Sequence, residues 1–421
     1  MLLARPYTLS SLDDAVRAAR RAGLDEQSAR GAGKGAGRPI QILLTGLPSG
    51  GAPLLARHGR GPSSDSSAPI VVSAGGEAAL VTGDRWSLFT LAARLGDEAA
   101  PGPALAGAIT TTLSRGDGAG PTWTFGTHRW TLGERTRVMG ILNVTPDSFS
   151  DGGRFVGVDA AMARATQLAE EGADILDVGG ESTRPGAGAV PADEERRRVV
   201  PVIRALAKLG LPISVDTTKA EVAEAALDAG ASVVNDVSGL AGGAALAELA
   251  ARYSAGLVLM HMRGRPDTMQ GETDYDDLLG EVCADLDRAV TTATAAGLPR
   301  AALAIDPGVG FAKTAGQSMT LLRRLEALSW SGLPILVGAS RKSFIGAVTG
   351  QPATERLAGS LAAATLAAHH GAHILRVHDV AETVAALQVA DAIRSAREEG
   401  TLFDEGSRFW RDDPRLVGRG G

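Results

Sequence analysis

Polar and charged side chains end eight short apolar segments in the second part of the chain. They are Asn143, Glu181, Thr183, Arg184, Asp216, Asn235, Asp236, His261, Asp306, Ser340, Arg341, Lys342, Arg376 and His378. One such ending would mean little, because a lone Asp at a strand end is usually a cap and a lone Lys is usually solvated. Together they predict the polar floor of a pocket.

Three of these side chains suit a flat heterocycle. Asp216, Asn235 and Asp306 offer carboxylate and amide edges. Such edges bind a ring that carries both hydrogen-bond donors and acceptors, as an aminopyrimidinone does.

Another group suits phosphate. Lys342, Arg376 and His378 bring positive charge to the last two segments, where barrels of alternating strands and helices commonly bind phosphate. Asn143 is a neutral oxygen ligand, and it suits one contact to a Mg²⁺ that is otherwise held by water and phosphate oxygens. The glycine-rich stretches 145–155 and 182–190 have the composition of loops that close over a pocket.

The elements that position these groups alternate regularly. Apolar runs at 138–144, 174–180, 212–217, 232–239, 256–262, 303–310, 334–340 and 373–379 are separated by stretches with helical spacing, such as 160–172 and 220–230. Runs buried on both faces and alternating with helices indicate parallel strands. Eight such units over roughly 260 residues predict an α/β protein with a (β/α)₈ barrel. A doubly wound open sheet is the alternative, disfavoured because no opening strand carries G-x-G-x-x-G.

The rest of the chain divides around this barrel. Residues 1–132 form either a small α/β domain or an extension, with candidate strands at 39–47 and 69–75 and helical patterns at 11–22, 87–95 and 103–113. The barrel is expected over 133–398 and a charged tail over 399–421. The GAGKGAG stretch is no phosphate loop, because Gly follows Lys34 and no strand immediately precedes it.

Composition excludes several classes of protein. The net charge of −6 gives no general attraction for nucleic acid. No stretch reaches the roughly 18 to 20 apolar residues of a membrane span, and the first 21 residues resemble neither a signal nor a transit peptide. Cys283 is the single cysteine, which excludes an intrachain disulfide. We therefore expect a cytoplasmic protein that acts on small molecules.

Two histidine features have simpler interpretations. His369, His370 and His373 straddle a helix end and the next strand, so metal binding there is disfavoured. His261 lies between Met260 and Met262 and is interpreted as a buried histidine with satisfied hydrogen bonds.

Seven motifs resemble, in order, those of the dihydropteroate synthase family. They are ILNVTPDSFSDGG (141–153), GADILDVGGESTRPGA (172–187), SVDT (214–217), VVNDVSG (233–239), IDPGVGF (305–311), GASRKSFIG (338–346) and RVHD (376–379). The resemblance covers the whole expected barrel. It implies a Mg²⁺-dependent, homodimeric transferase that joins 6-hydroxymethyl-7,8-dihydropterin diphosphate to p-aminobenzoate with loss of pyrophosphate.

The resemblance also implies roles for individual residues. The pterin ring would be held by Asp216, Asn235, Asp306 and Lys342, with Met260 or Met262 packing on it. Asn143, Thr183, Arg376 and His378 would hold the Mg²⁺–diphosphate. The p-aminobenzoate site would be shaped by Phe149, Arg184, Pro185, Phe311 and Ser343. Asp216, Asp306, Lys342, Arg376 and His378 would carry the catalysis.

Two other functions compete with this one. A methyltetrahydrofolate-binding methyltransferase would share the ring-binding Asp and Asn residues but would need neither the SRKSF segment nor the Arg and His pair. A non-catalytic pterin-binding module would be expected to lose polar or charged residues at Asn143, Arg184, Lys342 or Arg376, and all four are present.

Overall fold

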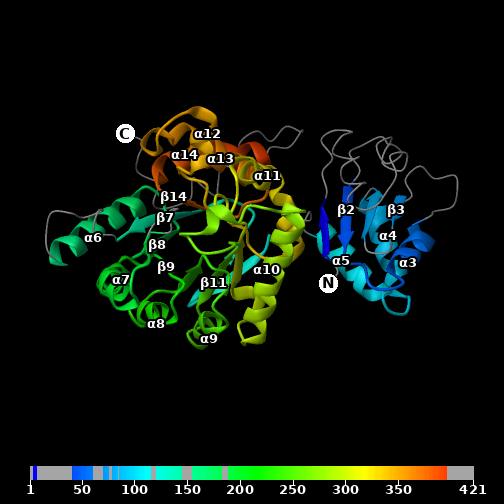
Figure 1. Cartoon of the computed structure of the whole chain (residues 1–421), viewed down its shortest axis with the longest axis horizontal. Helices are drawn as coiled ribbons and strands as arrows, with labels where there is room; N and C mark the ends of the chain where they lie inside the picture. The colour runs from blue at the N-terminus through cyan, green and yellow to red at the C-terminus, as the bar shows by residue number, and fades with distance from the viewer. Residues whose placement is uncertain are drawn as a thin grey trace. The chain divides into compact units, whose positions relative to one another are not determined.

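The computed structural model describes residues 3–6, 40–59, 70–74, 78–83, 85–114, 120–144, 154–182 and 188–395. The chain divides into two compact units (Figure 1). The first comprises residues 1–119 and 326–332, and the second comprises residues 120–325 and 333–421.

The first unit is built on a four-stranded antiparallel sheet. Its strands are β1 (Leu3–Pro6), β2 (Ile40–Thr45), β3 (Ile70–Ala74) and β4 (Ala78–Gly83), in the order β1-β2-β4-β3. Its helices are α3 (Gly51–Gly59), α4 (Arg85–Gly96) and α5 (Gly102–Ser114). Ile42 and Val81 on the sheet share one buried cluster with Leu55, Leu88 and Leu105 on the helices. The candidate strands and the last two helical patterns thus have counterparts, whereas the expected helix at 11–22 lies outside the described residues.

The second unit contains eight parallel strands in the sheet order β12-β11-β10-β9-β8-β7-β14-β13. They are β7 (Arg137–Asn143), β8 (Ile175–Gly179), β9 (Ile213–Asp216), β10 (Val233–Asp236), β11 (Gly256–Met260), β12 (Leu303–Asp306), β13 (Leu336–Val337) and β14 (Ile374–Val377). A parallel bridge between Ile305 and Ile335 joins the two ends of the sheet. The predicted (β/α)₈ barrel is therefore confirmed, and the open sheet was the wrong alternative.

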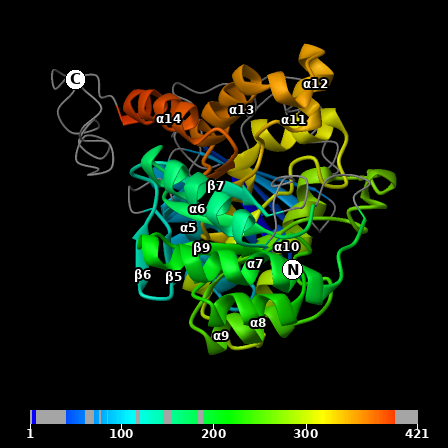
Figure 2. The same ribbon diagram turned by 90° about the vertical axis from the view of Figure 1, so that its left-hand side faces the viewer.

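Helices follow the strands around the barrel. They are α6 (Arg154–Glu170), α7 (Ala192–Leu206), α8 (Ala220–Asp228), α9 (Ala245–Arg252), α10 (Leu278–Ala295), α11 (Ala315–Arg323), α12 (Ser343–Thr349), α13 (Leu357–His369) and α14 (Val380–Ser395). Short 3₁₀ turns lie at Ala207–Leu209, Met269–Gly271, Arg300–Ala302, Leu325–Ser331 and Ala353–Glu355. Helices α7, α8 and α9 lie side by side along the outside (Figure 2). Gly172 and Gly230 follow helix ends with positive φ angles, which glycine adopts without strain.

A β-hairpin packs against the amino-terminal halves of the barrel strands. It consists of β5 (Thr122–Phe125) and β6 (His128–Thr131). Trp123 and Phe125 are fully buried in one cluster with strand residues such as Met139 and Val258. A Cβ on Gly256 would lie 2.9 Å from the Cβ of Phe125, so this strand needs glycine where the hairpin meets it. The hairpin lies within residues 1–132, the range predicted from the sequence to form the extension. In the structure it belongs to the second unit, together with the barrel.

Replacing Trp123 with Ala should destabilise the second unit by about 3–5 kcal/mol, because it leaves a cavity among fully buried neighbours. The indole also donates a 3.0 Å hydrogen bond to the Ala302 carbonyl, so Trp123→Phe should cost less than the alanine variant. Urea unfolding of both variants measures the two costs. Equal stability of Trp123→Ala and wild type would show that the hairpin is not part of the barrel core.

Candidate active site

One arginine neutralises two buried carboxylates inside the barrel. Arg376 on β14 donates from Nε to Asp177 Oδ2 at 2.5 Å and from Nη2 to Asp216 Oδ2 at 2.7 Å. Asp177 lies in β8 and is fully buried, and Asp216 is the last residue of β9. Asn235 on β10 donates to the same Asp177 oxygen at 3.1 Å. Four strands thus contribute to one polar layer.

Some acceptors in this layer have no partner among the described residues. The Oδ1 atoms of Asp177 and Asp216 are buried without a hydrogen bond there. Burial raises the pKa of Asp216 to about 7, with Asp177 adding to the rise and the Arg376 cation opposing it. A buried acceptor without a donor is costly. A ligand that carries N–H groups would therefore be stabilised beside Asp216.

A second charged pair lies at the ends of β12 and β13. Asp306 ends β12, and its Oδ1 accepts a hydrogen bond from Gly308 N at 2.7 Å. Burial raises the pKa of Asp306, and Lys342 opposes that rise. Lys342 precedes α12 and donates from Nζ to the Val309 carbonyl. Burial lowers the pKa of Lys342 to about 8, and the carboxylate of Asp306 opposes this decrease.

Lys342 also lies over an aromatic ring. Its Nζ is 4.4 Å from the centroid of the Phe311 ring, a cation–π contact. A Cβ on Gly310 would lie 3.2 Å from Lys342 Cδ, so the loop between Asp306 and Phe311 passes close to the lysine side chain. The lysine and this loop hold each other in place.

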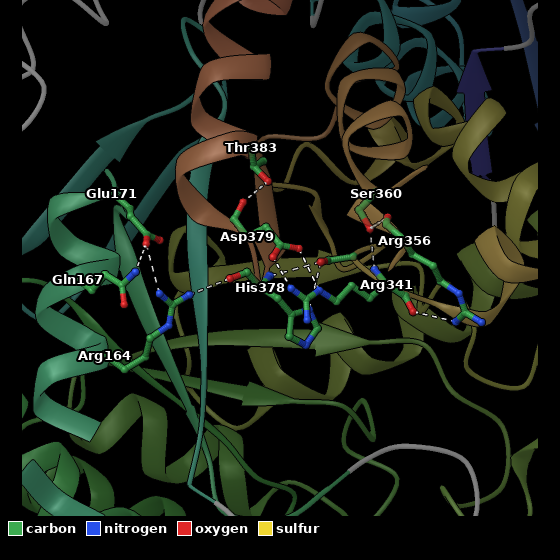
Figure 3. A network of polar contacts seen from close by, with 10 residues as sticks. Arg164, Gln167, Glu171, Arg341, Arg356, Ser360, His378, Asp379 and Thr383 are labelled. Atoms are coloured by element: carbon green, nitrogen blue, oxygen red, sulfur yellow. Dashed lines mark hydrogen bonds and ion pairs between the residues drawn. The ribbon is translucent and has the colours of Figure 1, made fainter. Parts of the chain in front are cut away.

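His378, after β14, is oriented by its neighbours (Figure 3). Its Nδ1 lies 3.0 Å from Ser340 Oγ, and its backbone N–H donates to the same oxygen at 3.3 Å. Arg164 on α6 donates to the His378 carbonyl at 3.1 Å, and Glu171 pairs with that arginine. The contact with Ser340 thus ties the orientation of the His378 ring to the segment that follows β13.

Arg341 joins the segments that follow β13 and β14 (Figure 3). Its guanidinium pairs with Asp379, the residue after His378. Its backbone has a φ of 57°, which is strained for an arginine. Ser360 Oγ accepts from its N–H at 2.9 Å, and Arg356 donates to its carbonyl at 3.1 Å. These contacts fix the backbone between Ser340 and Lys342.

The other predicted site residues are distributed around this layer. A Cβ on Gly179 would lie 3.6 Å from Asn143 Oδ1 and 3.8 Å from Asp216 Oδ2, so both side chains border the same space. Met260 is buried at the end of β11, in register with Asp306. Met262 and Phe311 are half-buried, and Ser343 is exposed at the start of α12. Phe149, Thr183, Arg184 and Pro185 lie outside the described residues, as does most of each glycine-rich loop.

Two buried charged residues at the candidate site were not predicted from the sequence. Asp177 links Asn235 to Arg376, and its signal was the period-two alternation that points Ile175, Asp177 and Gly179 to one side of a barrel strand. Lys313 is almost fully buried, with its Nζ 2.9 Å from His261 Nδ1. Nothing in the GFAKT sequence distinguishes such a lysine from a solvated one.

The histidines weighed as metal ligands have other contacts. His373 Nδ1 accepts a hydrogen bond from the Ile335 N–H at 3.0 Å, and the rings of His369 and His370 are in edge contact. Among the described residues, no group of three or more His, Cys, Asp or Glu side chains is arranged to hold a metal ion.

No helix in the described part of the chain is long and apolar enough to cross a membrane.

Comparison with known proteins identifies this arrangement. A family model described as pterin binding enzyme matches residues 139–378. A dihydropteroate synthase of Synechocystis sp. is 50% identical over 263 residues, covering 62% of this chain and 91% of that protein. The Escherichia coli K12 dihydropteroate synthase is 48% identical over 262 residues, covering 62% of this chain and 93% of that protein.

Solved structures of dihydropteroate synthases also resemble this chain in fold and sequence. The Xanthomonas albilineans dihydropteroate synthase with 4-aminobenzoic acid is 48% identical, covers 66% of this chain and 100% of that one, and has a TM-score of 0.62. The Burkholderia cenocepacia dihydropteroate synthase complexed with 7,8-dihydropteroate is 42% identical, covers 66% and 98%, and has a TM-score of 0.59. The barrel is that of a pterin-binding enzyme. Within that class, this chain belongs to the dihydropteroate synthase family of transferases.

The raised pKa of Asp216 predicts a pH-dependent stability for the unliganded protein. The buried carboxylate is charged above pH 7, and that cost is relieved as the pH falls through about 7 toward the ordinary value of 3.8. Wild type should therefore gain stability relative to Asp216→Asn below pH 7, by up to about 1.4 kcal/mol per pH unit. Above pH 7.5 or so the difference between them should be flat.

Urea unfolding between pH 5 and 8.5 tests this, with Glu221→Gln on the exposed side of α8 as the control. A stability difference for Asp216→Asn that did not change with pH would contradict the assignment.

Proposed function

We propose that the dihydropteroate synthase activity of this chain is carried out at the polar layer around Arg376. The reaction condenses 6-hydroxymethyl-7,8-dihydropterin diphosphate with p-aminobenzoate to give 7,8-dihydropteroate and pyrophosphate. The observation that carries this proposal is the ion-paired Asp177–Arg376–Asp216 group, in which each buried carboxylate keeps one oxygen without a partner among the described residues. It offers acceptors for a pterin ring beside a cation for its diphosphate.

The pterin ring would lie among Asp216, Asn235, Asp306 and Lys342. Its amino and ring N–H groups would donate to the carboxylates, and its carbonyl and ring nitrogens would accept from the amide and the ammonium. Met260, buried beside Asp306 in register, or Met262 would pack against its face. These groups lie on five different strand ends, so the barrel itself fixes their spacing.

The diphosphate would lie toward Asn143, Thr183, Arg376 and His378. Asn143 borders the same space as Asp216 and supplies a neutral oxygen, which suits a Mg²⁺ completed by water and diphosphate oxygens. When bound, Mg²⁺ would supply Lewis-acid stabilisation of the charge on the departing pyrophosphate. Arg376 would stay anchored to Asp177 and direct its remaining N–H groups to the leaving group, with His378 on the same side of the site.

The chemistry needs no side-chain nucleophile. The C–O bond between the pterin methylene and the diphosphate breaks, and the electron pair leaves on pyrophosphate. The cationic methylene is stabilised by Asp216 and Asp306 in a buried pocket. The arylamine lone pair of p-aminobenzoate then forms the C–N bond, and the nitrogen loses a proton. Phe149, Arg184, Pro185, Phe311 and Ser343 would shape the p-aminobenzoate site, and water must be excluded while the cation exists.

The proposed assembly is a homodimer in the cytoplasm. Helices α13 and α14 pack against each other and expose Leu366, Val389 and Ile393, with 54%, 60% and 70% of each residue accessible. Exposed apolar side chains on adjacent helices are typical of a surface that pairs with another protein. Cys283 is the single cysteine of the chain and is buried, so the fold does not depend on an intrachain disulfide, which is compatible with a reducing compartment.

Lys342→Ala should reduce kcat/KM for the pterin diphosphate by about 10²-fold or more, because it removes a half-buried cation that would contact both the ring and the anion. Pyrophosphate release is measured with purified protein, dihydropterin diphosphate and Mg²⁺, with and without p-aminobenzoate. The exposed Lys208→Ala is the matched control. Wild-type release that does not depend on p-aminobenzoate would sink the proposed function, and an unchanged Lys342→Ala would sink the residue assignment.

Ile393→Asp combined with Val389→Asp should convert the dimer to a monomer, because charge at the centre of an apolar interface costs several kcal/mol. Light scattering after size exclusion gives the mass directly. Ile393→Leu keeps the apolar surface and should remain dimeric. A monomeric wild type, or a double variant that stays dimeric, contradicts the assignment of this face.

A further inference from the structure

A buried lysine, Lys313, lies near Asp306 and Lys342 and takes no part in the mechanism above. Lys313 is 3% exposed, and its Nζ donates to the Phe311 carbonyl at 2.9 Å. A Cβ on Gly308 would lie 3.4 Å from that Nζ, so the ammonium lies against the loop that follows Asp306. Burial lowers the pKa of Lys313 to about 7, Asp306 and Asp285 oppose the fall, and Lys342 and Arg263 add to it.

A chain of polar contacts connects this lysine to the protein surface. Lys313 Nζ lies 2.9 Å from His261 Nδ1, and His261 Nε2 lies 3.1 Å from Asp285 Oδ2. The histidine is 3% exposed, and burial lowers its pKa, so the neutral ring is favoured. The neutral tautomer that satisfies both contacts has Nδ1 accepting from Lys313 and Nε2–H donating to Asp285.

The loop that this chain holds carries two groups of the active site. The Val309 carbonyl accepts from Lys342, and the Phe311 ring lies under the Lys342 ammonium. A Cβ on Gly308 would lie 1.9 Å from the His261 carbonyl, so the loop has no room to move toward β11. Contacts from Lys313 and His261 therefore fix the loop from behind, while Lys342 contacts it from the pocket side.

Stability alone does not explain a lysine at this position. Replacing a buried charge and its partners with an apolar side chain of similar size is often neutral or stabilising. An unbranched Met would fill the volume of the lysine stem without the cost of desolvating an ammonium. A buried ammonium whose partners are the Phe311 carbonyl and a neutral imidazole is better explained by what it positions.

We propose that Lys313 is a positioning residue for the p-aminobenzoate side of the active site, acting with His261 and Asp285 to hold the 307–313 loop. The inference rests on the proposed function, because the loop matters through Phe311 and Lys342. Lys313 touches neither substrate. It sets where the Phe311 ring stands beside the incoming arylamine.

Lys313→Met should raise the KM for p-aminobenzoate about tenfold, change kcat by less than about threefold, and leave the melting temperature unchanged or higher. His261→Leu should shift the same KM in the same direction, because it removes the acceptor of Lys313. The double variant should be little worse than either single variant, since residues that act as one unit are not additive.

Arg135→Met is the matched control, because Arg135 forms another buried ion pair, with Asp174, just before β7 begins. It should lower the melting temperature and leave the KM for p-aminobenzoate unchanged. The inference is overturned if Lys313→Met lowers the melting temperature and kcat without a specific rise in the KM for p-aminobenzoate, because that result would show a purely structural role. Wild type without p-aminobenzoate-dependent turnover would instead overturn the proposed function, and the inference with it.

Discussion

The ion pairs of Arg376 with Asp177 and Asp216 are the interaction on which the rest of the site depends. Two carboxylates inside a barrel repel each other and lose hydration, and one guanidinium between them compensates for both effects. Arginine suits this place because its planar fork donates in two directions and keeps its charge when buried. Removing it would leave two uncompensated buried acids, so the arginine holds the site together before any substrate arrives.

The fold offsets the cost of burying these carboxylates by separating apolar from polar layers along the barrel axis. Toward the amino ends of the strands, Trp123 and Phe125 of the hairpin fill the interior together with strand residues such as Met139. Toward the carboxyl ends, the inward positions change to Asp177, Asn235 and Arg376. A dry, rigid lower layer keeps the strands in register, so the charged groups above it stay at hydrogen-bonding distance without a ligand.

The barrel and many of its polar strand-end residues could be predicted from the sequence, because every strand of a parallel barrel places its carboxyl end at the same side of the fold. Each buried run ends where its side chains reach the pocket, so Asp216, Asn235 and Asp306 were recognisable from position alone. Asp177 was not, because it lies within a strand and only the alternation along that strand reveals its direction. Lys313 and the β5–β6 hairpin could not be found, since their partners are 52 residues away at His261 and 179 residues away at Ala302. Contacts at that separation leave no local pattern.

The charges of the candidate site fall into two sets, which would serve opposite steps of the proposed reaction. Asp216 and Asp306 are buried acids whose pKa values are raised, so in the empty site their negative charge is only partly stabilised. In the proposed reaction, a cation that forms on the pterin methylene would relieve this cost, and the barrier to C–O cleavage would fall accordingly. In the proposed reaction, Arg376, Lys342 and His378 would stabilise the departing anion. Because both sets are held by strand ends and their loops, charge separation occurs in a site already arranged for it, with little reorganisation at the moment of reaction.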